Sequence, residues 1–425
     1  MARNNILMFS TGNKNINELN QIPCNCKYCK NYINKPLSIP FEKILNHNYE
    51  SLINEVIFIR NEILNGSLRD LVEIRVKANT NSTALLRIFD DLHYNYIEER
   101  TPIIRKTKLI ATSKESLKRP EIKRFQERII NRYIKPNSKK ILLLLPCSSK
   151  KPYSFSKSHK RFQEQLFKLS NPNIVHEMII TSPIGIVPRE LELIYPASNY
   201  DIAITHNWDE DEKKMILDIL KEYLKTNQYD KIILHLPKNI TDFILKIFND
   251  PIITKIVKNP TSNESLKSLY NILKDECEKY ASISREKSKI EDFKSVLSYQ
   301  FDIKIAEAMI DKCKIKGKYP YNKLFNDNIQ LGMITKERGL ISLTMKGGER
   351  ISKFNKYTVE IFDDFSLEGS VFAPGIKNAD SGIRIGDEVI IIQDKKLLGV
   401  GVAKLNGNEM MKLNYGEAVK IRHKV

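Results

Sequence analysis

The segment 141-ILLLLPCSSKKPYSFSKSH-159 decides the expected fold of this chain. Its five apolar residues predict a buried strand, which ends abruptly in a polar and cationic loop that holds Cys147. Open α/β sheets bind their ligands where strands run into such loops. The loop offers a thiol, nearby positive charges and a possible base, His159. These are the groups that a thiolate nucleophile requires. The alternative is a basic surface loop with an incidental cysteine.

Strand-like and helix-like segments alternate between residues 140 and 260. The predicted strands lie at 141–146, 174–181, 200–205 and 231–237, and the predicted helices lie near 157–169, 209–226 and 239–249. This alternation is typical of a doubly wound α/β sheet. Polar loops at 181–190 and 200–209 also follow strands, so we expect three loops to converge at one edge of the sheet. The sequence has no G-x-G-x-x-G segment and no Walker loop, so a nucleotide-cofactor fold is unsupported.

The composition indicates a polyanion-binding protein with several domains. A chain of 425 residues is expected to form about two to four domains. The net charge of +18 favours nucleic acid as the partner, although the excess of Lys, Ile and Asn also fits a genome bias. No signal peptide, long apolar span or lipidation motif is visible, so we expect no membrane role. Six cysteines, three of them clustered, fit a reducing cytoplasmic setting.

Three cysteines, Cys24, Cys26 and Cys29, lie close together in the segment PCNCKYC. Their C-x-C-x2-C spacing lacks a local fourth ligand, which His47 would supply from further along the chain. Three thiolates and one imidazole make a closed tetrahedral zinc site, and such a site is structural because no position is left for water. The alternatives are an iron–sulfur cluster, which more often uses four cysteines, and free thiols beside an unrelated histidine.

The segments that flank the predicted sheet differ in character. Residues 48–99 predict a small unit of three helices, and the first helix ends near Gly66. The apolar residues of that first helix recur near helical spacing: Leu52, Val56, Ile57, Ile63 and Leu64. Residues 100–140 are densely basic and form either a phosphate-tracking helix or a solvated linker. Residues 261–290 predict one charged spacer helix. The last stretch of about seventy residues has short strands with Gly and Asp turns, which predicts a small β-barrel.

Four groups of motifs resemble parts of archaeal tRNA-modifying enzymes. The segments VFAPGI, IRIGDEVIII, LLGVGVAKLNGNEM and GEAVKIRHKV resemble a PUA domain, the RNA-binding module of tRNA- and rRNA-modifying enzymes. GLISLTMKGGERI resembles the adjoining C2 segment of archaeal tRNA-guanine transglycosylases, and CNCKYC with IRNEILNGSLRDLVE resembles their zinc subdomain. PCSSKKPYSFSKSH and TSPIGIVPRELELIYPASNYD resemble the core of the archaeosine synthase family, which is paralogous to those transglycosylases.

The resemblance implies a multidomain α/β and α+β protein. Its expected parts are a transglycosylase-like zinc-binding helical subdomain (1–105), a basic linker or helix (106–140), a doubly wound α/β core (141–290), a C2-like mixed domain (291–353) and a C-terminal PUA β-barrel (354–425). The family's longer members carry a transglycosylase-like barrel before the zinc subdomain, whereas only about twenty residues precede Cys24 here. We therefore expect no base exchange. The barrel is either dispensable or supplied by a separate polypeptide, and a homodimer is a further option.

The resemblance also implies the reaction and its partners. The family acts on 7-cyano-7-deazaguanine at position 15 in the D-loop of archaeal tRNA. It adds an amino donor, lysine or glutamine, to the nitrile, and a radical SAM partner enzyme performs the later step. A nitrile is unreactive toward water, so the enzyme must supply a nucleophile and a proton. Either Cys147 attacks first and the amine displaces it from a thioimidate, or the amine attacks directly. A non-catalytic tRNA-binding subunit is the competing interpretation.

The candidate site residues come from the three polar loops. The candidate catalytic residues are Cys147, Ser148, His159, Glu190 and Asp201, of which the last three are candidates for proton transfer. Lysines and Arg189 are candidates for holding phosphate or a donor carboxylate, and the two lysines nearest to Cys147 are expected to lower its pKa. The predicted substrate-binding residues are Lys150, Lys151, Pro152, Tyr153, Ser158, Ser182, Pro183, Gly185, Arg189 and Trp208.

Overall fold

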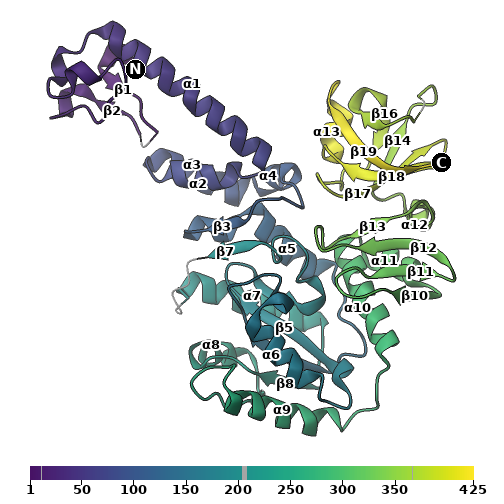
Figure 1. The fold of residues 1–425 in the computed structure, drawn as a ribbon. Helices are drawn as coiled ribbons and strands as arrows, with labels where there is room; N and C mark the ends of the chain where they lie inside the picture. Colours follow the sequence, from purple (N-terminus) through teal and green to yellow (C-terminus); the bar gives the residue numbers. More distant parts are fainter. Residues whose placement is uncertain (11, 203–207, 366) are drawn as a thin grey trace. The chain divides into compact units, whose positions relative to one another are not determined.

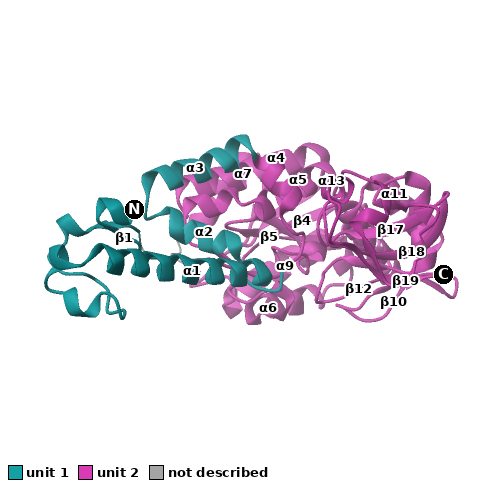
Figure 2. Ribbon diagram, turned by 90° about the horizontal axis from the view of Figure 1, so that it is seen from above, with its two compact units in different colours: residues 1–93, 105–109 teal, residues 94–104, 110–425 magenta. Residues whose placement is uncertain are grey.

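The computed structural model describes residues 1–10, 12–202, 208–365 and 367–425 (Figure 1). The chain forms two compact units, one of residues 1–93 and 105–109 and the other of residues 94–104 and 110–425 (Figure 2). Each unit has a hydrophobic cluster of its own. Across the described residues, every helix is too short or too polar to cross a lipid bilayer.

The first unit is built around the cysteine-rich loop. Its elements are the antiparallel strands β1 (Ile6–Leu7) and β2 (Lys14–Asn15), followed by the helices α1 (Phe41–Asn65), α2 (Leu68–Val76) and α3 (Thr80–Leu92). A small cluster that includes Leu7, Ile16, Ile22 and Ile44 is buried beside Cys29. So few apolar side chains make a small core.

Helix α1 confirms the helix predicted from the apolar spacing and its end near Gly66. Gly66 has a left-handed backbone (φ 71°), and its N–H bonds the last carbonyls of the helix. The helix has 25 residues, but only Ile44, His47 and Asn48 are buried. The cluster around the cysteines covers just its N-terminal end. The apolar residues that indicated the helix are therefore exposed: Leu52, Val56, Ile57, Ile63 and Leu64.

The second unit contains a five-stranded sheet in the order β6-β5-β4-β8-β9. Its strands are β4 (Ile141–Pro146), β5 (Val175–Thr181), β6 (Gly185–Pro188), β8 (Lys231–Leu234) and β9 (Ile252–Ile253). All are parallel except β6, which pairs antiparallel with β5. The chain runs from β4 outward to β5 and then crosses to β8 on the other side of β4. This confirms the predicted doubly wound topology.

Helices cover both faces of this sheet. Ile141, Leu143 and Leu145 of β4 share one buried cluster with residues of α6 (Lys157–Leu166) and α9 (Asn263–Cys277). Leu142 and Leu144 are also fully buried, and they face the opposite side because side chains alternate along a strand. The other helices of the sheet domain are α5 (Pro120–Asn131), α7 (Glu210–Thr226), which packs on α5 and β6, and α8 (Lys238–Ile244).

One predicted helix is wrong, and one predicted strand belongs to a different sheet. Residues 261–290 do not form one spacer helix, because α9 ends at Cys277 and a separate helix, α10 (Arg285–Gln300), follows. Leu266, Leu269 and Leu273 of α9 are buried against the sheet, and the many charged residues between them masked this narrow apolar stripe. The predicted strand at 200–205 lies outside the parallel sheet. Its first part, β7 (Tyr200–Ile202), pairs with β3 (Leu109–Ala111), and residues 203–205 lie outside the described residues.

Two β-rich parts complete the second unit. The first is an antiparallel sheet of β10 (Cys313–Lys316), β11 (Lys323–Asn326), β12 (Ile329–Ile334) and β13 (Ile341–Leu343), flanked by α11 (Ile303–Ile310) and α12 (Met345–Ile351). The second is a six-stranded sheet in the order β15-β19-β18-β17-β14-β16. It contains β14 (Thr358–Ile361), β15 (Ser370–Phe372), β16 (Ile376–Ala379), β17 (Glu388–Gln393), β18 (Lys396–Ala403) and β19 (Glu417–Lys424), with helix α13 (Gly407–Lys412). The remaining helix, α4 (Tyr94–Arg100), opens the unit.

A buried carboxylate joins the two β-rich parts. Glu388 in β17 is 1% exposed and accepts hydrogen bonds from Arg338, Arg422 and the backbone N–H of Leu343. Two guanidinium groups compensate the cost of burying one carboxylate. The domain boundaries given above stay predictions, and the boundary at residue 290 falls inside α10.

We predict that Leu143→Ala destabilises the sheet domain by about 2–5 kcal/mol. Leu143 is fully buried in the central strand, so the substitution removes apolar contact and leaves a cavity. Ile253→Ala, in edge strand β9 at a side chain that is 49% exposed, is the matched control and should cost much less. Urea unfolding, followed by circular dichroism, measures both. Equal losses for the two variants would contradict the central role of β4.

Candidate functional site

The loop after β4 lies at the switch point of the sheet. The connections of β4 and β8 leave toward opposite faces, and doubly wound sheets bind their ligands at such a point. Cys147 directly follows Pro146, the last residue of β4, and is partly buried. The thiol interacts with the Thr181 hydroxyl at the end of β5. The loops after β4 and β5 thus meet, as the sequence predicted.

Burial raises the pKa of the Cys147 thiol, and the Thr181 hydrogen bond and the charge of Lys151 only partly oppose this effect. The charge of Lys151 lowers this pKa as predicted, but burial outweighs it, so the predicted net lowering is wrong. The Lys151 ammonium lies 3.9 Å from the centre of the Tyr200 ring, and Lys150 is exposed. A thiol in this environment stays protonated at neutral pH.

Three hydroxyl groups form a hydrogen-bonded chain beside the thiol. The Tyr200 hydroxyl lies 2.7 Å from the Tyr153 hydroxyl and 2.5 Å from the Thr181 hydroxyl. Both tyrosines are fully or almost fully buried. Thr181 and Tyr200 were absent from the predicted site, although each stands at a strand end next to a predicted residue. That position is the signal that would have found them.

His159 connects this loop to a second group of charged residues. Its Nε2 lies 3.0 Å from the Pro146 carbonyl, and its Nδ1 lies 2.8 Å from a guanidinium nitrogen of Arg189. Because Arg189 can only donate, Nδ1 accepts, and Nε2 carries the hydrogen toward the carbonyl. Burial first, and the charge of Arg189 second, lower the pKa of His159 to about 2. Both ring nitrogens are thus occupied, and the ring is neutral.

The charged group centres on Arg189. Its guanidinium bonds Glu177 (2.5 Å) and Glu192 (2.9 Å) in addition to His159. Glu190 accepts from the Tyr133 hydroxyl and lies 3.4 Å from His176. Burial opposes ionisation of Glu190, but His176 and Tyr133 outweigh it, so its pKa is lowered. The predicted residues therefore fall into two groups, one at Cys147 and one at Arg189, with His159 between them.

The other predicted residues lie around these groups. Ser182 donates to Glu212 (2.5 Å), Ser158 lies 3.2 Å from Ser156, and the Trp208 ring meets Phe243 edge-on. Gly185 has φ 97°, and a Cβ there would lie 2.7 Å from Ile219, so only glycine fits. Pro152 and Pro183 are buried, Ser148 is partly buried and Asp201 is exposed. Residues 203–207, including His206 of the third loop, lie outside the described residues.

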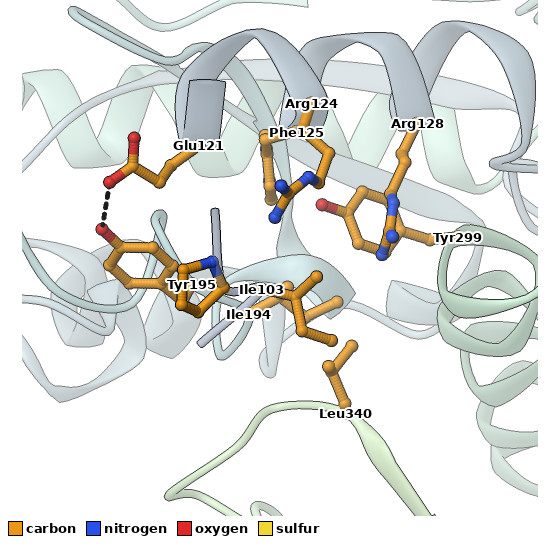
Figure 3. Close-up of a pocket in the computed structure, with 10 residues that line it drawn as sticks. Ile103, Glu121, Arg124, Phe125, Arg128, Ile194, Tyr195, Tyr299 and Leu340 are labelled. Atoms are coloured by element: carbon orange, nitrogen blue, oxygen red, sulfur yellow. Dashed lines mark hydrogen bonds between the residues drawn. The ribbon is translucent and has the colours of Figure 1, made fainter. Parts of the chain in front are cut away.

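A small closed pocket lies elsewhere in this unit, between α5 and α10. Figure 3 shows the Tyr195 hydroxyl facing the Glu121 carboxylate (3.4 Å), with Arg124 and Arg128 nearby. The Arg128 guanidinium lies 5.8 Å from the Tyr299 ring centre. The free volume is about 10 Å³, which is room for at most one water molecule. This pocket is therefore too small for a ligand larger than a water molecule.

The first unit brings the four predicted metal ligands together. Their ligand atoms all lie within 4.8 Å of one another. His47 Nδ1 is 3.8 Å, 3.5 Å and 3.4 Å from the sulfurs of Cys24, Cys26 and Cys29. His47 Nε2 lies 2.9 Å from the Met8 carbonyl, and that bond directs the Nδ1 lone pair toward the sulfurs. These residues fit a single tetrahedral ion with thiolate and imidazole ligands.

Comparisons with known proteins agree with this architecture. Residues 122–273 match a family described as "Domain of unknown function (DUF5591)", and residues 364–425 match the PUA domain. The crystal structure of AF0587, a protein of unknown function, superposes on 72% of this chain and 98% of its own, with a TM-score of 0.55 at 27% identity. The chain is thus a PUA-domain protein with an α/β core and a Cys3His cluster.

Sequence similarity to named proteins identifies the family within this class of PUA-domain proteins. The chain is 37% identical to archaeosine synthase subunit alpha of Methanosarcina acetivorans, over 99% of its own length and 69% of the relative's. It is 36% identical to archaeosine synthase of Haloferax volcanii, over 97% and 70% of the two lengths. It is also 28% identical to a tRNA-guanine(15) transglycosylase of Methanobrevibacter smithii, over 99% and 61%. The chain belongs to the archaeosine synthase family.

We predict that the second unit loses stability as the pH falls below about 6.5. The unfolded chain takes up a proton at His159 near that pH, whereas the folded chain does not until a pH of about 2. The lowered pKa of His159 therefore gives stability that is present above pH 6.5 and is lost on acidification, by about 2 kcal/mol between pH 7 and 5. Chemical unfolding across this range should show a shallower pH dependence for His159→Gln. The exposed His423→Gln is the control and should keep the parent's slope, and equal slopes for all three proteins would refute the assignment.

Proposed function

We propose that this chain is a tRNA-modifying enzyme of archaeosine biosynthesis. It adds an amino donor to the nitrile of 7-cyano-7-deazaguanine in the D-loop of tRNA. The observation that carries the proposal is the identity of 36% and 37% to proteins named archaeosine synthase, over at least 97% of the chain. The PUA match and the net charge of +18 support tRNA as the macromolecular substrate. A tRNA substrate favours a cytoplasmic location.

The first chemical step is the addition of the Cys147 thiol to the nitrile. The S–H bond breaks, a bond forms from sulfur to the nitrile carbon, and the proton passes to the nitrile nitrogen. The product is a thioimidate, and no net charge is created. The raised pKa of Cys147 supports this neutral addition over a preformed thiolate, because burial penalises separated charge.

The second step returns the thiol. The nitrogen of a neutral amine bonds the thioimidate carbon, the carbon–sulfur bond breaks, and one amine proton moves to sulfur. The hydroxyls of Thr181, Tyr200 and Tyr153 form a chain suited to carry protons between sulfur and nitrogen. Lys151 beside Tyr200 is suited to bind an anionic group of the tRNA. Direct attack by the amine is the alternative, in which the thiol only donates a proton.

We assign His159 and Arg189 a positioning role. The buried neutral ring of His159 donates to the Pro146 carbonyl, next to Cys147, and Arg189 fixes the orientation of that ring. Their hydrogen bonds therefore set the direction of the backbone that carries the thiol. The proposal also includes three partners. They are an amino donor, lysine or glutamine; a radical SAM enzyme; and either a second copy of this chain or a separate barrel subunit.

We also propose that Cys24, Cys26, Cys29 and His47 hold one structural Zn²⁺. The ion would supply cross-links among β1, the cysteine loop and α1, which the small cluster of apolar residues in this unit does not provide on its own. All four ligands come from the protein, so the site leaves no open position for water or substrate.

Cys147→Ala should reduce formation of the modified nucleoside by at least about 10³-fold while tRNA affinity stays unchanged. The reason is that alanine cannot form the thioimidate. The measurement is incorporation of labelled amino acid into nitrile-bearing tRNA, with filter binding for affinity. Cys313→Ala is the matched control, since Cys313 is another partly buried cysteine of this unit.

The outcomes separate the mechanisms. Full turnover by Cys147→Ala would rule out covalent catalysis and leave direct attack. Tight tRNA binding without any turnover by the unmodified chain would instead favour the non-catalytic tRNA-binding subunit.

Elemental analysis should find about one zinc per chain. Cys26→Ser should lose that metal and lower the melting temperature of the first unit, because metal binding and folding are coupled. Cys277→Ser, at a buried cysteine outside the cluster, is the control and should keep the metal. Iron in place of zinc, or full metal content in Cys26→Ser, would refute the assignment.

A further inference from the structure

The four-stranded antiparallel sheet β10–β13 has one covered face and one open face. Helices α10, α11 and α12 pack on this sheet (Figure 1), and the face that they cover carries the buried side chains of Leu324 and Leu343. Gly347 of α12 lies so close to Leu343 that an added Cβ would approach its side chain to 3.3 Å. Because side chains alternate along a strand, the residues next to Leu324 point to the opposite, open face. This face lies outside residues 364–425, which match the PUA domain.

The open face carries positive charge along two adjacent strands. Lys314 and Lys316 lie on β10. In the register of the sheet, Lys314 is opposite Phe325 of β11, and Lys316 is opposite Lys323. Opposed residues of an antiparallel pair share a face, so these four side chains lie together. Residues 312–336 contain six lysines and one acidic residue, a net charge of +5 within 25 residues, so this segment is far more basic than the chain as a whole.

The pairing of Lys316 with Lys323 places two cationic side chains directly opposite each other. Like charges in this position destabilise a sheet. All three lysines of the open face are exposed, and among the residues that the structure describes none of them forms an ion pair. The Lys316 ammonium instead lies 4.7 Å from the centre of the Phe325 ring. Anionic groups bound along these strands would relieve the repulsion, and the phosphates of a nucleic acid supply such a row.

Phe325 selects among the classes of partner. Its ring is partly exposed on the same face as the lysines, and the bases of a single strand can stack on such a ring. The bases of a duplex are stacked on one another and do not reach it. By analogy, RRM domains also stack unpaired bases on aromatic residues of a four-stranded sheet. A protein partner fits less well, because within β10–β13, all of which the structure describes, the apolar residues of the open face are Phe325 and Met333.

We propose that the open face of β10–β13 binds unpaired nucleotides of RNA. Phe325 stacks on a base, and Lys314, Lys316 and Lys323 bind the flanking phosphates. RNA binding by this face follows from its charge and its exposed ring. That the RNA is the tRNA substrate rests on the proposed function, and the face would then hold an unpaired segment of the tRNA as a second contact beside the PUA domain.

Fluorescence anisotropy of the full chain with a short oligouridylate tests the stacking. Phe325→Leu keeps an apolar side chain but removes the ring, so it should weaken binding at least about fivefold. Phe325→Tyr keeps the ring and should stay within about twofold of the parent. A short RNA duplex should bind all three proteins alike, and thermal melting shows whether each variant is folded. Equal affinity of the parent and a folded Phe325→Leu variant for the single strand would overturn the proposal.

The salt dependence tests the lysines. Each phosphate contact of a single strand contributes about 0.7 to the slope of log affinity against log salt, so Lys314→Gln, Lys316→Gln and Lys323→Gln together should lower that slope by about 2. The control variant carries the same change at exposed lysines outside this face: Lys287, Lys304 and Lys353. Its slope should match that of the parent. Equal reductions in both variants would mean general attraction to a basic chain and would contradict a site on this face.

Photocrosslinking locates the contact. An oligouridylate that carries 5-iodouridine should join, on irradiation, to the peptide that contains Phe325. Crosslinks confined to residues 364–425 would assign the RNA to the PUA domain instead and refute the site.

The same variants separate this inference from the proposed function. Oligouridylate binding that depends on Phe325, without amino transfer to tRNA by the parent chain, would refute the function and keep the site. Amino transfer by the parent, with face variants that bind oligouridylate and tRNA as the parent does, would refute the site and keep the function.

Discussion

Arg189 makes the interaction on which the geometry of the core domain depends. One guanidinium group holds two carboxylates, Glu177 of β5 and Glu192, together with the ring of His159 on α6. A buried guanidinium cannot lose its proton, so it needs these acceptors, and each acceptor needs the guanidinium. The cluster therefore fixes the neutral state of His159 and its bond to the Pro146 carbonyl. Removing Arg189 would leave Glu177 and Glu192 without their cation.

This cluster lies between the Cys147 loop and the wall of a large cavity of about 570 Å³. On one side, His159 reaches the backbone next to Cys147. On the other side, Arg189, Glu177 and Glu192 form part of the wall of the large cavity. At the Cys147 site, hydroxyl groups lie beside a thiol whose pKa is raised. Such a site suits a reaction that creates no net charge. The wall of the cavity instead carries several charged side chains.

The two units are stabilised in different ways. The sheet domain buries a continuous apolar cluster between β4, α6 and α9. The first unit has a much smaller cluster and brings three cysteines and His47 within 4.8 Å of one another. A metal ion bound there would contribute folding free energy that the apolar core does not supply. This difference explains why the apolar residues along most of α1 are exposed, since the cysteine-rich unit covers only the start of the helix.

The sequence by itself determined the local features. The apolar run at 141–145 determined the central strand, and the C-x-C-x2-C spacing indicated three of the four candidate metal ligands. The core motifs that follow this strand, together with the motifs at both ends of the chain, indicated the family. These signals lie in short segments, where composition and periodicity report directly on burial or ligation. Only the tertiary structure decided the pKa of Cys147, because burial outweighs the charge of Lys151, which the sequence places nearby. The tertiary structure also brings Thr181 and Tyr200 next to the thiol. It places Arg189 and Glu190 apart from the thiol, on the wall of a cavity. These contacts unite residues far apart in the chain, and their energies depend on exclusion of water, which no single segment specifies.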